Sequence, residues 1–264
     1  MSEPVSGQSL RDVLNELPRM ADRDLRTVTT DSELALTHAW FVRCVDSINA
    51  ALVLHDQGLG RVADPLVRSA MEHAVGMRWL RQLGHDALFA LGRSHQRWAA
   101  NVQSAVAASN EQEKQLGRTE WSPELDAVFD ELAAQEIPEG SVDGEWKIEN
   151  RFKVAKAFDL YVAWLSETAT SHATQASAAP YVVVGSDRYH LLRSPRSLGD
   201  TLELRCASVA VDAFRSMGEA LGSDVWRATV DRLDERLTAA LIRATTAGLL
   251  DPPSSDDWSS RFEH

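Results

Sequence analysis

The sequence predicts an all-α protein, a single helical bundle of about six to eight helices, with room for one short β-hairpin near residues 181–192. Apolar residues recur at spacings of three and four through most of the 264 residues, which is the periodicity of helices that bury one face. Capping residues and glycine or proline stops separate these stretches. The composition, 44% hydrophobic and 25% charged, is that of an ordinary globular protein.

Each predicted helix combines an apolar stripe with a start or stop signal. From the N-terminus, helices are predicted over residues 9–17, about 31–57, 64–83, 86–108, 122–135, 149–176, 198–221 and 223–247. The expected N-caps are Ser9, Thr30 in a capping box with Glu33, Asp64 before Pro65, and Ser223. Pro18 is expected to end the first helix, and Gly58 the second.

The chain is expected to form one domain over residues 1–264, because no linker or internal repeat divides it. Residues 1–30 are expected to form an N-terminal arm with a short helix, and residues 249–264 a loose tail. Residues 111–149 hold twelve acidic and three basic residues, which is −9 of the net charge of −12 and leaves −3 elsewhere. This acidic segment is expected to be a peripheral segment or insertion.

Composition also narrows the classes of function. An excess of acidic residues argues against a general nucleic-acid binder, although a local basic face is compatible with it. Neither a membrane-spanning segment nor a secretion signal is recognisable, so we expect a cytoplasmic protein that does not contact membranes. The two cysteines, Cys44 and Cys206, are expected to be buried free thiols, and with no metal-ligand spacing we expect neither a metal nor a cofactor.

Polar side chains beside apolar stripes form the candidate site. They lie on three predicted helices: Asp46 and Asn49 on the second, Arg68, Glu72 and Trp79 on the third, and Tyr161, Ser171 and His172 on the helix from 149. Because polar groups that enter a core need partners, we expect a network in which Arg68 bonds to Glu72, with Asn49 or Tyr161 as further partners. Such a network either fixes helix register or supplies a cation, an acid and a base to one pocket.

Two segments also resemble a known family. The stretch from Ala63 to Leu80, with an R-S-x-x-E pattern from Arg68 to Glu72, and the later Tyr161 followed by Ser171-His172 are similar to a family of uncharacterised bacterial all-helical proteins. That family is distantly similar to the HEPN superfamily (higher eukaryotes and prokaryotes nucleotide-binding). The resemblance covers residues 31–100 and 150–180 and implies a four-helix core, a homodimer and, in active members, a metal-independent ribonuclease motif R-x(4–6)-H.

Arg68 and His73 have the spacing of that motif, with Ser69 where active members carry a polar amide or an acid. On a straight helix, residues five apart point about 140° away from each other, so Arg68 and His73 converge only if the helix bends. His172 is the other candidate histidine, and the sequence leaves the choice open.

Two functions compete on these observations. The first is a metal-independent ribonuclease or nucleotide-acting toxin or defence effector, in which Arg68 binds phosphate and His172 or His73 is the general acid and base. In that hypothesis Tyr161, Ser171 and Glu72 orient the catalytic groups, and Asn49, Asp46, Trp79, Arg188 and Arg193 contact RNA or a nucleotide. The second is a non-catalytic helical module that binds a ligand or a protein partner. An open cleft favours the first, and a sealed, fully paired network favours the second.

Overall fold

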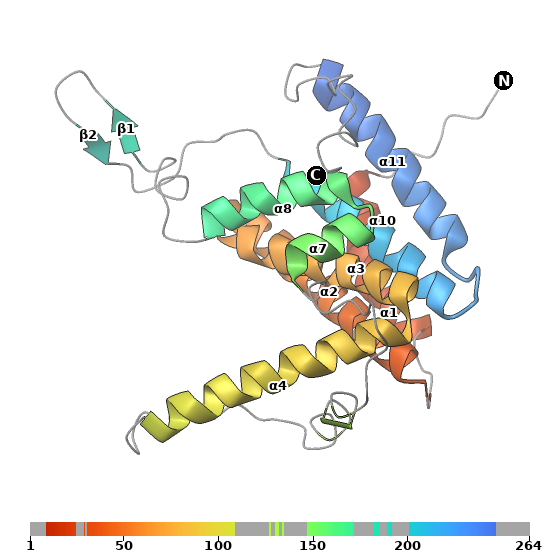
Figure 1. Ribbon diagram of the computed structural model, residues 1–264. Coiled ribbons are helices and arrows are strands. Elements are labelled where there is room, and N and C mark those ends of the chain that lie inside the picture. The colour runs from red at the N-terminus through yellow and green to blue at the C-terminus, as the bar shows by residue number, and fades with distance from the viewer. Residues whose placement is uncertain are drawn as a thin grey trace.

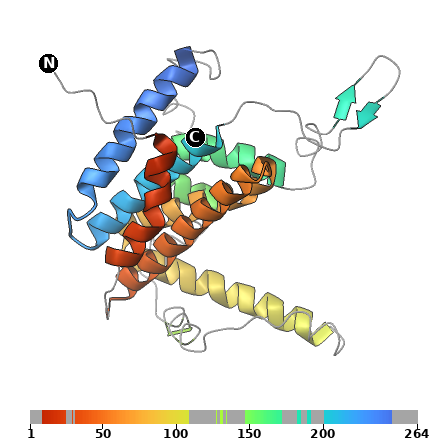
Figure 2. The ribbon, with the colours of Figure 1, turned by 180° about the vertical axis from the view of Figure 1, so that it is seen from behind.

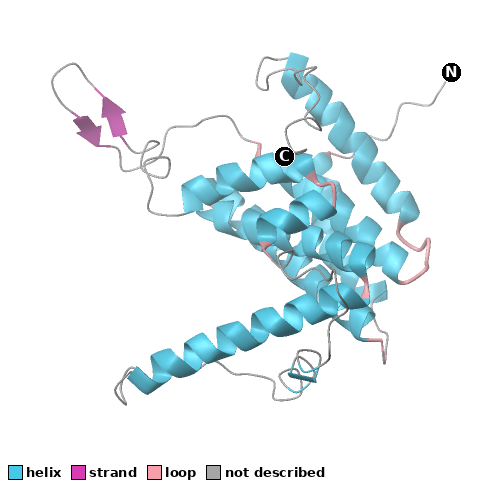
Figure 3. Cartoon of the chain, viewed as in Figure 1, coloured by secondary structure: helices cyan, strands magenta, loops and turns pink. Residues whose placement is uncertain are grey.

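The computed structural model describes residues 9–24, 29, 31–108, 127, 130–131, 134, 147–171, 182–184, 189–191 and 201–246, and it confirms the all-α class (Figures 1 and 3). The helices are α1 (Leu10–Asp24), α2 (Ser32–Asp56), the 3-10 helix η1 (Gly60–Ala63), α3 (Asp64–Leu83), α4 (His85–Ala108), α7 (Ile148–Val154), α8 (Phe158–Ser171), α10 (Leu202–Ala220) and α11 (Arg227–Thr246). The expected hairpin is present as β1 (Val182–Val184) and β2 (Tyr189–Leu191), which pair antiparallel with Val183 opposite His190.

Three helices form the centre of the bundle. α2, α3 and α10 pack against one another, α1 covers α2 and α10, and α11 lies along α10 and α1 (Figure 2). On the other side, α7 and α8 cover α3 (Figure 1). Phe41, Phe214 and Trp226 meet inside this core, where ring centroids 4.8–5.3 Å apart join α2 to the end of α10 and the start of α11. Burying each such side chain contributes roughly 1.5–3 kcal/mol.

α4 follows α3 after a tight turn and leads away from the central helices. Gly84 has φ +55, a left-handed conformation that glycine adopts without a Cβ penalty. The first turns of α4 pack Leu88 and Phe89 into a second, smaller apolar cluster with Trp79 of α3. Beyond this cluster α4 extends past the rest of the bundle (Figure 1). The divergence of α4 from α3 and α8 positions the site described below.

Two predicted helix boundaries are wrong. α1 continues through Pro18 to Asp24, because Leu14, Leu17 and Ala21 share a buried face whose packing outweighs the missing backbone hydrogen bond. At the other end of the chain, α11 begins at Arg227 rather than next to Ser223.

The predicted helix 149–176 is two helices, with a break between α7 and α8. Lys156 has φ +51, and the backbone N–H groups of Lys156 and Ala157 donate to the carbonyls of Lys153 and Phe152, which is a Schellman ending. On a continuous helix Phe152 and Ala157 would point about 140° apart, yet both are fully buried. The break allows both side chains to face the core.

Helix caps agree with the sequence in part. Ser9 caps α1, since its hydroxyl accepts from the backbone N–H of Asp12 while the Asp12 carboxylate accepts from Ser9 N–H. α2 is capped by Asp31, whose carboxylate accepts from Glu33 and Leu34. Predictions that lie outside the described residues are Thr30, most of 111–149 and the 122–135 helix, and the tail 249–264. Among the helices that the structure describes, none is long and apolar enough to cross a membrane.

Candidate functional site

Arg68 and Glu72 form the predicted ion pair, and a third residue completes it. The Nε atom of Arg68 lies 2.9 Å from Oε1 of Glu72, and the indole Nε1 of Trp164 donates to the same oxygen at 2.8 Å. The guanidinium of Arg68 also lies over the Trp164 ring, with Cζ 5.3 Å from the ring centroid. We call Arg68, Glu72 and Trp164 the Glu72 network. It ties α8 to α3 and fixes the orientation of the Glu72 carboxylate.

Arg151 of α7 lies on the other side of Glu72, between two indole rings. Its Cζ atom is 4.7 Å from the centroid of Trp79 and 5.9 Å from that of Trp40. Its Nε atom is buried and has no hydrogen-bond acceptor within the part of the chain that the structure describes. Burial lowers the pKa of Arg151 to about 10, and the negative charge of Glu72 opposes this shift. Arg151 is therefore a largely desolvated cation that still carries its charge at neutral pH.

His73 is held in one tautomer. Its Nδ1 atom lies 2.6 Å from the backbone carbonyl oxygen of Ser69, one turn earlier on α3. A carbonyl oxygen can only accept, so Nδ1 carries the proton and Nε2 of the neutral ring keeps a lone pair. Burial lowers the pKa of His73, and the positive charges of Arg43 and Arg151 lower it further, while the Ser69 hydrogen bond and Glu72 oppose the shift. His73 is thus a neutral base at physiological pH.

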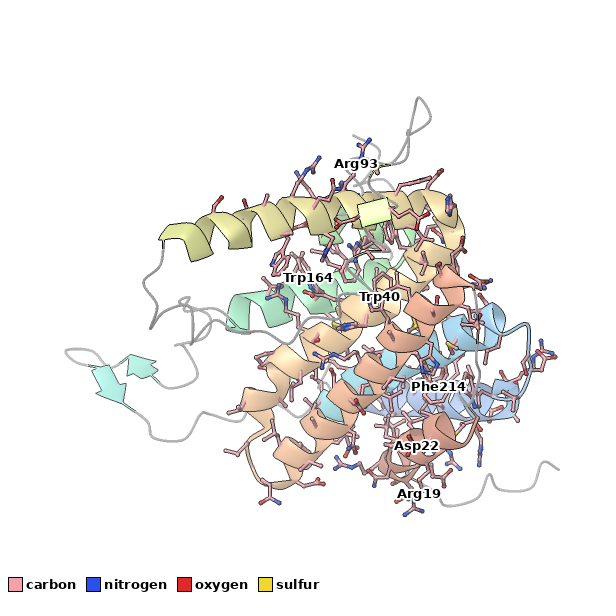
Figure 4. The ribbon with its side chains drawn as sticks, turned by 90° about the horizontal axis from the view of Figure 1, so that it is seen from below. Arg19, Asp22, Trp40, Arg93, Trp164 and Phe214 are labelled. Atoms are coloured by element: carbon pink, nitrogen blue, oxygen red, sulfur yellow. The ribbon has the colours of Figure 1, made fainter. Side chains whose placement is uncertain are left out.

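An open pocket joins these groups. It has a volume of about 370 Å³ and is lined by Trp40 of α2, Glu72 and His73 of α3, Ser94 of α4, and Ile148 and Arg151 of α7. We call it the Arg151 pocket. It lies where α4 diverges from the bundle, and Figure 4 shows Trp40 and Trp164 on the bundle side of α4, with Arg93 on the opposite side. The pocket therefore brings a cation, a carboxylate, a neutral imidazole and a hydroxyl to one solvent-accessible space.

The Trp40 ring packs against a glycine, Gly76 of α3. An ideal Cβ built on Gly76 would lie 3.1 Å from two carbons of the Trp40 ring, so the ring packs flat against the α3 backbone. Since α2 and α3 are neighbouring antiparallel helices, Arg43, one turn beyond Trp40, comes opposite His73, one turn before Gly76. Arg43 is exposed. Exposed Arg43 and half-buried Arg151 therefore both act on His73 and make this region locally positive in an acidic protein.

The structure brings together some of the predicted site residues. Arg68, Glu72, His73 and Trp79 lie in or beside the Arg151 pocket, and Tyr161 joins the Glu72 network by stacking on Trp164 with ring centroids 6.0 Å apart. Asp46 and Asn49 are exposed, and Asp46 lines a separate pocket between α1 and α2 with His38. The structure gives Glu72 a partner that was not predicted, Trp164 of α8.

Other predicted site residues lie outside the description. Ser171 is the last residue of α8, with its side chain outside the described set, and His172, Arg188 and Arg193 are not among the described residues. Arg68 does not line the Arg151 pocket, and its Nε–H donates to Glu72. The cation that lines the pocket is Arg151, and the phosphate-binding role of Arg68 stays a prediction.

Sequence reasoning missed Arg151, Trp164, Trp40 and Ser94. The sequence does contain a signal for Arg151. It lies three residues before Val154, on the line that continues the apolar stripe of this helix by one turn, and a charged residue is unusual on such a stripe. No comparable signal marks Trp164, whose bond to Glu72 spans 92 residues. Within the described ranges, no group of three His, Cys, Asp or Glu side chains could hold a metal ion.

Comparison with known proteins gives one match. Neither the curated proteins nor the solved structures include a significant match to this chain. A family model, described as a family of unknown function (DUF5677), matches residues 34–189, which is more than half of the chain and includes every residue of the Glu72 network and of the Arg151 pocket. The chain therefore belongs to this family of unknown function, DUF5677.

Proposed function

We propose that the Arg151 pocket binds the phosphate of RNA or of a nucleotide, and that the protein is a metal-independent, HEPN-like ribonuclease of the toxin or defence-effector kind. The observation that carries this proposal is Arg151. It is a half-buried cation between two indole rings, its buried Nε–H has no acceptor in the described part of the protein, and it lines an open pocket beside a neutral histidine. A guanidinium binds phosphate through paired N–H donors, and low local polarity strengthens that interaction.

The groups in the pocket suit cleavage of a phosphodiester bond. Nε2 of His73 would take the proton from a ribose 2′-hydroxyl, whose oxygen then forms a bond to phosphorus. The bond from phosphorus to the 5′-oxygen breaks, that oxygen takes a proton from water, and the hydroxide that remains recovers the proton held by His73. Arg151 would stabilise the charge that develops on the non-bridging oxygens, and Ser94 supplies a further hydrogen bond from α4. The products are a 2′,3′-cyclic phosphate and a free 5′-hydroxyl.

Arg68 has a positioning role in this proposal. It neutralises Glu72 together with Trp164, so that the carboxylate beside the pocket does not repel a phosphate as strongly as an unpaired one would. Glu72 is also the observation that favours the alternative, a non-catalytic module, because a carboxylate in a pocket suits a ligand with N–H donors better than an anion.

The test is cleavage of labelled single-stranded RNA in the presence of a chelator. Wild-type protein is expected to produce fragments with cyclic phosphate ends, and His73→Gln should lower the rate by roughly 10²-fold or more, the typical contribution of an acid–base group. His85→Gln is the matched control, because His85 is exposed at the start of α4 and packs against Phe89 away from the pocket. If the protein binds the RNA without cleaving it, the result favours the non-catalytic module. If the protein neither binds nor cleaves the RNA, the proposal is overturned.

We further propose that the protein acts in the cytoplasm as a homodimer. Cys44 and Cys206 are buried and form no disulfide, which suits a reducing compartment. Val162 and Leu165 on α8, 48% and 45% exposed, and Ile242 on α11, 62% exposed, are apolar side chains that a second copy could cover. Light scattering at micromolar concentration is expected to give twice the chain mass of 29.1 kDa. A mass of one chain would contradict the dimer.

A further inference from the structure

Trp98 lies one helical turn beyond the Arg151 pocket, on the same face of α4. Ser94 lines the pocket, and a residue four positions later on a helix lies about 6 Å along the axis and nearly in line with it. The Trp98 side chain is 41% exposed although it is among the largest apolar side chains of the protein. α4 therefore carries a solvent-accessible indole one turn beyond the residue with which it lines the pocket of Arg151.

The Trp98 ring is also oriented by its surroundings. It stacks on the imidazole of His95, with ring centroids 5.9 Å apart and planes inclined by 24°. An aromatic ring that is oriented before a ligand arrives loses less conformational entropy on binding. Single exposed apolar residues are common on protein surfaces, so exposure alone would carry no inference. The combination of exposure, stacking and position beside the Arg151 pocket is what distinguishes Trp98.

We propose that Trp98 is a stacking subsite for a nucleobase of the strand whose phosphate binds at Arg151. This inference rests on the proposed function and extends it, because it makes the substrate a single-stranded oligonucleotide rather than a mononucleotide. Bases stack on aromatic side chains with little sequence preference, and a base in a duplex has no free face for this contact. The pocket would hold the phosphate, and the outer part of α4 would hold an adjacent base.

The charge distribution fits a strand that passes His73. Arg43 lies on the α2 side of His73 and Arg151 on the α7 side, and both are close enough to lower the pKa of His73. A mononucleotide with one phosphate needs one of these cations, whereas an oligonucleotide offers successive phosphates to both. The proposed path therefore runs from Arg43, past His73 and Arg151, to Trp98 on α4.

The test is a mutant cycle between protein and RNA, measured by fluorescence anisotropy. Wild type, Trp98→Ala and Trp98→Phe are titrated against a short labelled single-stranded RNA, against the same RNA with one abasic position placed in turn along it, and against a mononucleotide. Trp98→Ala should weaken binding of the intact RNA by about tenfold or more, the range expected for one stacked base. Trp98→Phe should keep most of the affinity, and neither change should alter binding of the mononucleotide.

The abasic RNA identifies the contact. At one position, loss of the base should weaken binding to wild type and leave binding to Trp98→Ala unchanged. Leu59→Ala, a truncation of another exposed apolar residue, is the control and should bind like wild type. The stacking subsite is wrong, and the proposed function stands, if the wild type binds RNA, Arg151→Met abolishes that binding, and Trp98→Ala leaves the affinity unchanged. If wild type binds no RNA, both fail.

Discussion

The indole Nε1 of Trp164 lies 2.8 Å from Oε1 of Glu72, the same oxygen that accepts the Nε–H of Arg68. One carboxylate oxygen thus joins α3 to α8 and is held by two donors. Glu72 also lines the Arg151 pocket. Glu72 therefore forms part of the pocket wall, and its pairing with Arg68 and Trp164 sets how much negative charge a phosphate bound there would meet.

Trp164→Phe removes the N–H donor and keeps most of the apolar surface. A hydrogen bond to a charged group contributes about 1.5–3 kcal/mol, and the partial exposure of Glu72, 34%, places the expected loss of unfolding free energy toward the lower end, about 1–2 kcal/mol. Urea denaturation measures it. Leu59→Ala, at an exposed apolar residue outside the proposed interfaces, should change stability by less than about 0.5 kcal/mol. Equal effects of the two changes would show that the Trp164 N–H contributes nothing specific.

The Arg68–Glu72 pair could be predicted from the sequence because it is local. Residues four apart on a helix are neighbours whatever the tertiary fold, so an arginine and a glutamate at that spacing need only the helix to meet. The Trp164 bond could not be predicted, because it depends on how α8 lies across α3. The helix break at Lys156 was also hidden, since Ala155, Lys156 and Ala157 all favour helix and only the burial of Phe152 and Ala157 on one side demands the turn.

Tertiary packing likewise decided which cation faces the pocket. Arg68 and Arg151 both lie beside apolar stripes, and sequence alone singled out Arg68 because Glu72 and His73 follow it. In the fold, the Nε–H of Arg68 donates to Glu72, whereas Arg151 packs against Trp40 and Trp79 and its Nε–H has no acceptor among the described residues. The all-α class could be predicted because the apolar periodicity extends over long segments. That pattern does not depend on which single side chain faces a pocket.

His73 should make stability depend on pH in the weakly acidic range. Its pKa in the folded protein lies below the ordinary value of 6.5, chiefly because of burial, so the unfolded chain binds the proton more readily. Unfolding free energy is then highest above about pH 6.5 and decreases as the pH falls from that value toward the folded pKa, below which the loss from this group is complete. Urea denaturation of wild type and His73→Gln between about pH 5 and 8 measures the effect.

The difference between the two proteins isolates His73 from other titrating groups. The wild type should lose more stability than His73→Gln on acidification, and RNA cleavage should fall over the same range, because Nε2 must be unprotonated to act as a base. Parallel stability curves for the two proteins, or cleavage that increases as the pH falls through this range, would contradict the assignment of a neutral, buried His73.

Gly76→Ala should disturb Trp40 and with it the Arg151 pocket. The new Cβ would lie 3.1 Å from two Trp40 ring carbons, so the ring must move outward by a few tenths of an ångström. The gain in helix propensity, up to about 1 kcal/mol, offsets part of the overpacking, for which about 1–3 kcal/mol is typical. We expect a net loss of about 1 kcal/mol, a changed tryptophan emission and weaker RNA binding.

Gly218→Ala on α10 is the matched control for this change. Its Cβ would meet only the Ser223 carbonyl oxygen at 3.4 Å, an ordinary contact. Stability should therefore stay level or increase, and RNA binding should be unchanged. An unaltered emission spectrum and unaltered RNA affinity for Gly76→Ala would show that the Trp40 ring has no part in the pocket.

The most direct test of the account is the RNA affinity of Arg151→Met, measured by anisotropy beside the thermal unfolding of the same protein. Methionine keeps much of the apolar contact with Trp79 and Trp40 and removes a buried charge, so the melting temperature should stay level or increase. If Arg151 holds the phosphate, Arg151→Met should lower the RNA affinity at least tenfold while the protein stays stable. Arg227→Met, which removes an exposed ion pair, should bind RNA like wild type. Undiminished RNA binding by Arg151→Met would contradict the central claim.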